Sequence, residues 1–336
     1  MISPVSSSLT LAASAPSIAI GQSIVLSAKL GGVAKAGVPA PTGEVLFQDN
    51  GAPAGTVTLD SGSATLTLTT LAVGDHTITA IYTGDSNWST SHASVTVHVT
   101  LPALRLTNAA SNLSSSFAPD EIVSMFNVTG LNGDTGATLP LLTSLGGTMV
   151  TVKDSAGATR AAQLYGVFAS AGQANFVMPA STAKGAATVT VTGFSGSQSA
   201  QVTIADAAPG LFTANQNGRG APTGQIVLVH ADGSHTVENL ATLSGTTYVA
   251  TAIKLASATD QIFLQLYETG IRHASKVTGT ISGTPVTVLY AGQQGTYPGL
   301  DQVNLQLPKT LQASGALNVV ITAGTQAANG VMVLIQ

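Results

Sequence analysis

Short runs with a period of two are the feature that most limits what this chain can fold into. Leu26, Ala28 and Leu30 alternate with polar residues, and the same period returns in "ATLTLTT" (64–70) and "SVTVHV" (94–99). Successive side chains of a β-strand point to opposite faces, so a period of two predicts strands. No segment keeps apolar residues at i, i+3, i+4 and i+7 for three turns, so we expect no long amphipathic helix.

Turn signals separate the predicted strands at short intervals. In the first hundred residues they are Asn50-Gly51, Ser61-Gly62, Gly74-Asp75 and Gly84-Asp85. Short strands at this spacing are typical of a β-sandwich. We therefore predict one Ig-sized sandwich over residues 1–100, followed by the connector "TLPA" (100–103).

The remainder of the chain contains an internal repeat. "DEIVSMFNVTGL" (120–131) aligns with "DQIFLQLYETGI" (260–271), and "GQANFVMPAS" (172–181) aligns with "DQVNLQLPKT" (301–310). The offset between copies changes from the first match to the second, which favours two divergent sandwiches over a solenoid.

The predicted fold is therefore all-β, with three tandem Ig-like β-sandwich domains of which the last two are a divergent internal repeat. Their expected bounds are 1–100, 101–207 and 208–336. In this alignment Tyr165 corresponds to Tyr290, so we expect Tyr290 to serve the core.

Composition narrows the class of protein. Apolar residues make up 44% of the 336 residues and charged residues 8%, with a net charge of −4. A charged fraction this low is typical of secreted β-rich proteins. The basic residues are scattered along the sequence, so they form no basic cluster that would bind nucleic acid. Cysteine is absent, which excludes disulfides and thiolate metal sites. No apolar run has the length of a membrane span.

The N-terminal stretch "MISPVSSSLTLAAS" lacks both a basic segment and a long apolar segment, so it does not have the features of a signal peptide. We expect a secreted or cell-surface bacterial protein whose signal was removed or precedes the given sequence.

Residues 41–51, "PTGEVLFQDNG", and 74–88, "GDHTITAIYTGDSNW", together resemble the bacterial Ig-like repeat of the group 3 type. The resemblance covers about residues 5–100. Such repeats occur in tandem in large surface and secreted proteins. The resemblance implies a spacer or adhesive unit without catalytic residues.

Residues 104–336 resemble a C-terminal domain of unknown function that is abundant in Acidobacteria and best known from Solibacter. The matching stretches include "APDEIVSMF", "LYAGQQGTYPGLDQVNLQLP" and "AANGVMVLI". Members of that family have no assigned activity and usually end long exported proteins. Glu268 departs from the small or regular strand residue expected at its position.

Residues that could carry chemistry are sparse. His230 and His235 flank a predicted hairpin turn, but zinc needs three or four converging ligands. A glycosidase needs two carboxylates about 5–10 Å apart, and the sequence leaves open a pair such as Asp260 with Glu268. We predict no enzyme, no catalytic residue, no metal site and no cofactor.

The candidate contacts for a ligand or partner lie mostly in one insert. Residues 293–300, "QQGTYPGL", have no counterpart in the first copy of the repeat. The candidates are Tyr297, Gln294, Asp301, Trp88 and Arg219. Trp88 is the aromatic of the Ig-like motif and is more simply explained as a core residue.

We therefore predict a non-catalytic exported surface or extracellular structural protein, acting as a spacer, adhesion or self-assembly module, with a filament subunit as one form. Its partner would be a second copy of itself, through strand exchange or end-to-end assembly of residues 2–11, or surface glycans. The alternative is a glycan-binding accessory module of a larger secreted protein.

Overall fold

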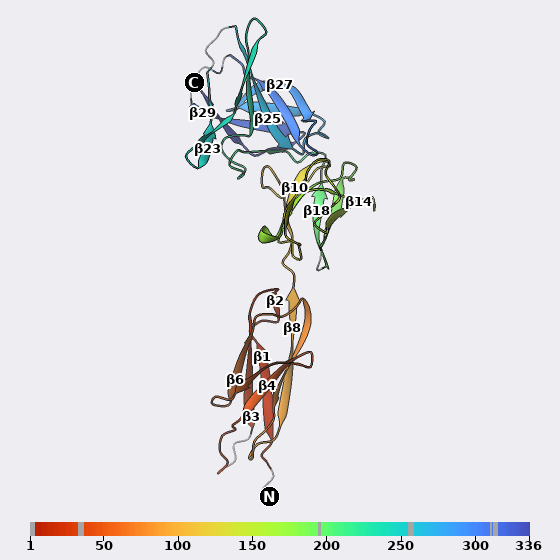
Figure 1. The fold of residues 1–336 in the computed structure, drawn as a ribbon, viewed down its shortest axis with the longest axis vertical. Coiled ribbons are helices and arrows are strands. Elements are labelled where there is room, and N and C mark those ends of the chain that lie inside the picture. The colour runs from red at the N-terminus through yellow and green to blue at the C-terminus, as the bar shows by residue number, and fades with distance from the viewer. Residues whose placement is uncertain (1–3, 33–36, 194–195, 255–258, 310, 312–314) are drawn as a thin grey trace. The chain divides into compact units, whose positions relative to one another are not determined.

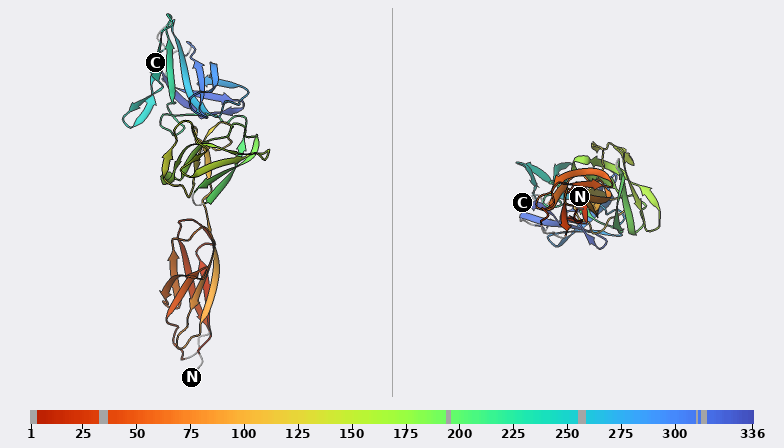
Figure 2. Two further views of the ribbon diagram at one scale, coloured as in Figure 1. Left: turned by 45° about the vertical axis from the view of Figure 1, so that its right-hand side comes forward. Right: turned by 90° about the horizontal axis from the view of Figure 1, so that it is seen from below.

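The computed structural model describes residues 4–32, 37–193, 196–254, 259–309, 311 and 315–336. Strands joined by turns make up this part of the chain, which contains no α-helix, and the predicted all-β fold of tandem Ig-like sheets is confirmed (Figure 1, Figure 2). The chain divides into two compact units, Met1–Pro102 and Ala103–Gln336. No helix of the described residues is long and apolar enough to cross a membrane.

Two sheets form the first unit. One has the strand order β1-β3-β6 and the other β2-β8-β7-β4-β5, with β2 parallel to β8 and the other pairs antiparallel. The strands are β1 (Ser7–Ala13), β2 (Ser17–Ala19), β3 (Ile24–Gly32), β4 (Glu44–Asp49), β5 (Ala52–Thr58), β6 (Ser63–Leu68), β7 (Gly74–Tyr82) and β8 (Ser91–Thr100).

The core of the first unit follows the predicted alternation. Leu26 and Ala28 are buried on the inner face of β3, while Lys29 between Ala28 and Leu30 is exposed. Trp88 is 6% exposed, and its indole Nε1 donates a hydrogen bond to the carbonyl oxygen of Pro39 at 2.9 Å. Trp88 is therefore a core residue of this unit and is not available as a surface contact.

The segment predicted for strand exchange, residues 2–11, lies partly outside the described residues, at positions 2 and 3. Its later part enters β1, which pairs with β3 from Ser7 to Ala13 and lies at the edge of its sheet. Leu9 of β1 is buried in the core. Donating β1 to a neighbour would therefore remove a strand from this sandwich, and self-assembly through it stays a prediction.

The second unit begins with two facing sheets. Their strand orders are β11-β15-β16-β10-β9 and β12-β13-β17-β18, with β14 paired to β13. The strands are β9 (Arg105–Asn108), β10 (Ile122–Phe126), β11 (Asp134–Gly136), β12 (Ser144–Leu145), β13 (Thr148–Lys153), β14 (Thr159–Ala161), β15 (Gln163–Phe168), β16 (Gln173–Val177), β17 (Gly185–Gly193) and β18 (Gly196–Ile204). A 3-10 turn, η1 (Ala169–Ala171), precedes β16.

The rest of the second unit is one continuous sheet of order β21-β20-β25-β28-β27-β26-β29-β31-β24, with β19 paired to β25 and β30 to β29. β22 and β23 form a separate hairpin. The strands are β19 (Gly210–Leu211), β20 (Gly224–Val229), β21 (His235–Asn239), β22 (Ala241–Ser244), β23 (Thr247–Ala250), β24 (Ala252–Ile253), β25 (Gln261–Thr269), β26 (Val277–Ile281), β27 (Thr284–Gln293), β28 (Asp301–Gln306), β29 (Gly315–Ala323), β30 (Gln326–Ala327) and β31 (Val331–Ile335).

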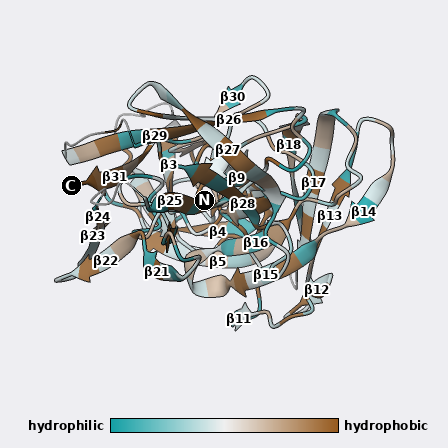
Figure 3. Ribbon diagram, turned by 90° about the horizontal axis from the view of Figure 1, so that it is seen from above, coloured by the Kyte–Doolittle hydropathy of each residue, from teal (hydrophilic) through white to brown (hydrophobic). Residues whose placement is uncertain are grey.

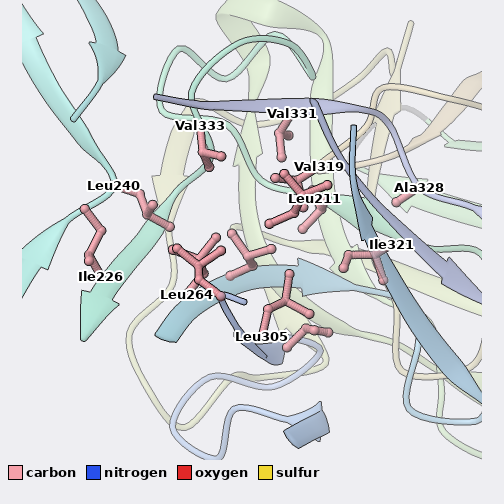
Figure 4. Close-up of a cluster of buried hydrophobic side chains, with 14 of the residues drawn as sticks. Leu211, Ile226, Leu240, Leu264, Leu305, Val319, Ile321, Ala328, Val331 and Val333 are labelled. Atoms are coloured by element: carbon pink, nitrogen blue, oxygen red, sulfur yellow. The ribbon is translucent and has the colours of Figure 1, made fainter. Parts of the chain in front are cut away.

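This sheet folds over on itself along β27, because the first residues of β27 pair with β26 and the later ones with β28. The two resulting layers enclose a core in which Leu264 and Leu305 meet Val319 and Val331 (Figure 4). Hydrophobic and hydrophilic residues follow one another along many strands (Figure 3). The second unit thus holds two cores, and a domain boundary at 207–208 stays a proposal.

The two copies of the internal repeat share one polar contact. Gln173 donates to Asn175 at 2.8 Å, and Gln302 donates to Asn304 at the same distance. Asn175 lies opposite Gly166, whereas Asn304 lies opposite Tyr290. Each copy has a β-bulge just before this position, and the strand register matches Tyr290 to Gly166, one residue away from the match in the sequence alignment.

The expected core role of Tyr290 is wrong. In the strand register Tyr290 corresponds to Gly166 of the first copy, not to Tyr165. The side chain of Tyr290 is 43% exposed. Its hydroxyl donates to the carbonyl oxygen of Gln293 at 2.5 Å, which ties it to its own strand.

Candidate functional site

A cleft of about 1040 Å³ lies in the second unit, between its two halves. One wall is the outer face of the sheet that contains β10, β15 and β16. Ser124 and Phe126 of β10 and Asn175 of β16 line this wall, while the alternate residues Val123 and Met125 are buried in the core behind it. The period of two therefore places the outward-facing residues of these strands in the cleft.

The opposite wall comes from the second half of the unit. Gln225 of β20, Asn239 of β21 and Tyr267 of β25 contribute, together with Gln294 and Tyr297 of the loop after β27. Gln225 and Asn239 are direct cross-strand neighbours. The cleft is thus built from strand faces and loops that lie far apart in the sequence.

Aromatic rings and side-chain amides dominate the lining. The aromatic residues are Phe126, Tyr165, Phe212, Tyr248, Tyr267 and Tyr297. Seven Asn and Gln side chains accompany them, and no Asp, Glu, Lys, Arg or His belongs to the described lining. Arg105, which does not line the cleft, stacks on Phe126 with its guanidinium carbon 4.2 Å from the ring centre.

The insert loop 293–300 joins the two halves of the unit. The hydroxyl of Tyr165 donates to the carbonyl oxygen of Pro298 at 2.6 Å. The hydroxyl of Thr269 donates to the carbonyl oxygen of Gly299 at 2.7 Å and accepts the backbone N–H of Ile122 at 2.8 Å. Burial raises the pKa of Tyr165 to about 12, so this phenol keeps its proton and donates.

A charged cluster lies beside this loop. The guanidinium of Arg272 donates through Nε to Asp301 at 2.8 Å and lies 3.5 Å from the carboxylate of Asp120. His273 contacts the same Asp120 carboxylate at 2.8 Å. Asp120 belongs to the first half and the other three to the second, so these ion pairs also hold the halves together.

Two glutamates near this cluster are fully buried. Glu121 accepts the backbone N–H of Ala118 through Oε2 at 2.6 Å, while its Oε1 has no hydrogen-bond partner among the described residues. Within the same part of the chain, neither carboxyl oxygen of Glu268 has a partner. Burial raises the pKa of both groups well above the ordinary value, because a low-dielectric interior favours the neutral, protonated form of a carboxyl group.

The predicted contact residues separate into two groups. Tyr297, 49% exposed, and Gln294 both line the cleft. Asp301 is fully buried and paired with Arg272, so the expectation that it is an accessible contact is wrong. Arg219 is exposed in its loop but does not line the cleft, and Trp88 lies in the first unit's core.

Sequence reasoning did not identify Tyr267, Tyr248 and Gln225. The signal for Tyr267 was present, because Ile262, Leu264 and Leu266 alternate with it and must face the core. An aromatic residue on the opposite face of such a strand must point outward.

The carboxylate pair left open for a glycosidase is not brought together. Asp260 precedes β25 and Glu268 lies eight positions later on the same strand, which is about 26 Å at the rise of an extended chain. Asp260 instead contacts His230 at 3.2 Å. Among the residues that the structure describes, no three His, Asp or Glu side chains converge as a metal site would require.

The fold defines a class, that of all-β proteins, and the first unit of this chain is a two-sheet sandwich. Residues 10–100 match the family described as "Bacterial Ig-like domain (group 3)". The first predicted resemblance is thereby confirmed for these residues. The match ends at residue 100, so the likeness of residues 104–336 to the Solibacter-type domain stays a prediction.

Similar solved structures were found at low identity. The tetra-tandem repeat in the extending region of a large adhesion protein is 14% identical, covering 98% of this chain and 99% of that one, with a TM-score of 0.24. The adhesin InvE of Yersinia pseudotuberculosis is 15% identical over 58% of each chain, also at 0.24. The fibronectin(III)-like modules of Clostridium thermocellum CbhA are 15% identical, covering 58% and 93%, at 0.21.

At TM-scores this low, these structures support no conclusion about this chain, and none of the matches supports the predicted filament. No curated protein matches the sequence.

Proposed function

We propose that this chain is a non-catalytic bacterial protein of the cell surface or extracellular space. In it the group 3 Ig-like sandwich acts as a spacer and the second unit makes the adhesive contact. The observation that carries this proposal is the match of residues 10–100 to the bacterial Ig-like family. The low charged fraction of 8% supports it, because Ser, Thr, Asn, Gln and Gly then form most of the polar surface.

The structure of the first unit fits a spacer. Its core is continuous, with Phe47, Tyr82 and Ile78 fully buried. The phenol of Tyr82 donates to the carbonyl oxygen of Thr42 at 2.9 Å, so this buried polar group is satisfied. A packed sandwich of this kind holds its two ends at a fixed distance, as a spacer requires.

Fractionation of the bacterium that encodes the chain tests the location. An antibody against residues 103–336 should detect the protein in the culture medium or on intact cells, and external protease should remove it from those cells. Detection in the cytoplasm alone, protected from protease until lysis, would contradict the proposal.

A glycan-binding accessory module is the second candidate. Tyr297 and Gln294 favour it, because both line a cleft whose other residues are neutral. The two candidates differ in what the second unit contacts. A glycan-binding module recognises a specific ligand, whereas the adhesive unit of the first proposal contacts surfaces without one.

A further inference from the structure

We infer that the cleft of the second unit is a binding site for an uncharged oligosaccharide chain. This inference rests on the proposed extracellular role and adds the chemical class of the ligand. Its basis is the combination of six aromatic rings, seven side-chain amides and no charged side chain in the described lining.

Three of the four tyrosine hydroxyls of the cleft are available to a ligand, and the fourth, that of Tyr165, donates to Pro298. Outside the cleft, the hydroxyls of Tyr82 and Tyr290 donate to backbone carbonyl oxygens of the protein. Those of Tyr248, Tyr267 and Tyr297, which all line the cleft, make no hydrogen bond within the described residues. A phenol both donates and accepts, as a sugar hydroxyl does.

The amides of the cleft are similarly available. The side chains of Gln225 and Asn239 lie side by side on neighbouring strands and make no hydrogen bond within the part of the chain that the structure describes. An amide offers two donors and one acceptor oxygen, so a pair of them can bind neighbouring hydroxyls of one sugar ring. A charged ligand would instead need a cation or an anion in the lining.

The aromatic rings supply the apolar part of such a site. Tyr297 is 49% exposed and Tyr248 is 42% exposed, so substantial surface of each side chain is open to solvent. A pyranose has one face of C–H groups that packs on an aromatic ring, while its hydroxyls point to polar partners. Small-molecule sites usually span about 300–1,000 Å³. The cleft, at about 1040 Å³, therefore has room for several sugar units.

A peptide fits this cleft less well. Extended peptides commonly bind by pairing with an unpaired sheet edge. Four of the strands that line the cleft, β10, β16, β20 and β25, each have a neighbour on both sides and present only a face to it. The edge strand β21 contributes only its last residue, Asn239, and the hairpin β22–β23 contributes Ala241 and Tyr248. A peptide lying along the sheet faces would lack the main-chain pairing that gives such complexes their affinity.

Native-gel affinity electrophoresis of the full chain tests the inference. The gels would contain a neutral β-glucan, a mannan or a galactan, with polygalacturonate as the anionic probe. We expect at least one neutral polysaccharide to retard the protein, and polygalacturonate to leave its mobility unchanged. Tyr297→Ala and Tyr267→Ala should each weaken the retardation about tenfold, as the loss of one stacking platform predicts.

Tyr290→Ala is the matched control. Tyr290 is as exposed as Tyr248 but does not line the cleft, so its loss should leave binding within twofold of the unchanged protein. Thermal melting would establish that all three variants fold.

The inference would be overturned if none of the neutral polysaccharides retarded the protein, or if retardation survived both cleft substitutions in folded protein. It would also be overturned if the protein bound polygalacturonate, or a casein-peptide mixture used as a further probe, in preference to the neutral polysaccharides. Any of these outcomes on a protein that fractionates to the cell surface would leave the proposed location standing.

Discussion

Glu268 is a carboxyl group inside a hydrophobic core. It lies on the inner face of β25 after Ile262, Leu264 and Leu266, and it is fully buried. Its register partner on β28 is Asp301, whose negative charge adds to the effect of burial in raising the pKa of Glu268. A protonated carboxyl is tolerated at such a position, whereas an ionised one is not.

Glu268 makes the second unit less stable as the pH rises. The folded state keeps a proton that the unfolded chain releases above the ordinary pKa of 4.5, so the free energy of unfolding falls from that pH upward. Each pH unit between the ordinary and the raised pKa costs about 1.4 kcal/mol. Glu268→Gln removes this ionisable group. The variant should have a higher melting temperature at pH 8, and its stability should change less with pH between pH 5 and 8.

Glu238→Gln, at an exposed position on β21, is the control and should change neither quantity. Differential scanning calorimetry across this pH range makes the measurement. A Glu268→Gln variant with an unchanged slope would show that Glu268 is not the group that titrates, although Glu121 contributes in the same direction.

At the residue scale the sequence predicted part of the site. The lack of a repeat counterpart pointed to Tyr297 and Gln294, and both line the cleft. Asp301 was wrongly predicted to be accessible. The alternation in β28 indicates the opposite, because Val303 and Leu305 share its face and are fully buried. Tyr248 could not be found, since only the folding of the β22–β23 hairpin brings it to the cleft.

The loop 293–300 is one of the elements through which the halves of the second unit meet. Its length marked it as an insert in the sequence, but the sequence gives no sign that it reaches Tyr165 of the other half. Gly299 shows how tightly it packs. Its backbone has φ of +78°, and an added Cβ would lie 2.7 Å from Cγ1 of Ile122.

Gly299→Ala should therefore destabilise the second unit by more than its backbone strain alone. Gly295→Ala in the same loop is the matched control, with φ of +99° and nothing within 4 Å of the added Cβ. Both changes incur about 1–2 kcal/mol for a left-handed backbone, and the clash at Gly299 adds about 1–3 kcal/mol. Urea unfolding of both variants measures the difference, and equal losses would contradict a packed interface at this loop.

The strands themselves were the most predictable elements. Alternation and turn signals sufficed for β3, β6, β7 and β8, where one face is buried and the other exposed. The bulges in β15 and β27 were not predicted. Each changes the spacing of core-facing residues from two to three, from Leu164 to Val167 and from Val288 to Ala291, and apolar or aromatic residues on both faces conceal this change in the sequence.

At the scale of the whole molecule, the chain forms two compact units with separate cores, and our proposals assign a different role to each. The first, Met1–Pro102, contains the family match and a two-sheet sandwich, to which we assign the proposed spacer role. The second, Ala103–Gln336, contains the cleft, the ion pairs of Arg272 and the loop that joins its halves. The internal repeat predicted two related sandwiches there, but the cleft also contains Gln294 and Tyr297, which have no counterpart in the first copy.

Binding by the separated units tests most directly whether the proposed ligand site lies in the second unit. Residues 1–102 and 103–336 would be produced as two proteins, each with its own core, and passed over an immobilised neutral polysaccharide that retards the full chain. We predict that residues 103–336 bind with the affinity of the full chain and that residues 1–102 do not bind. Retention of binding by residues 1–102, or its loss from folded 103–336, would contradict the assignment of the ligand site to the second unit.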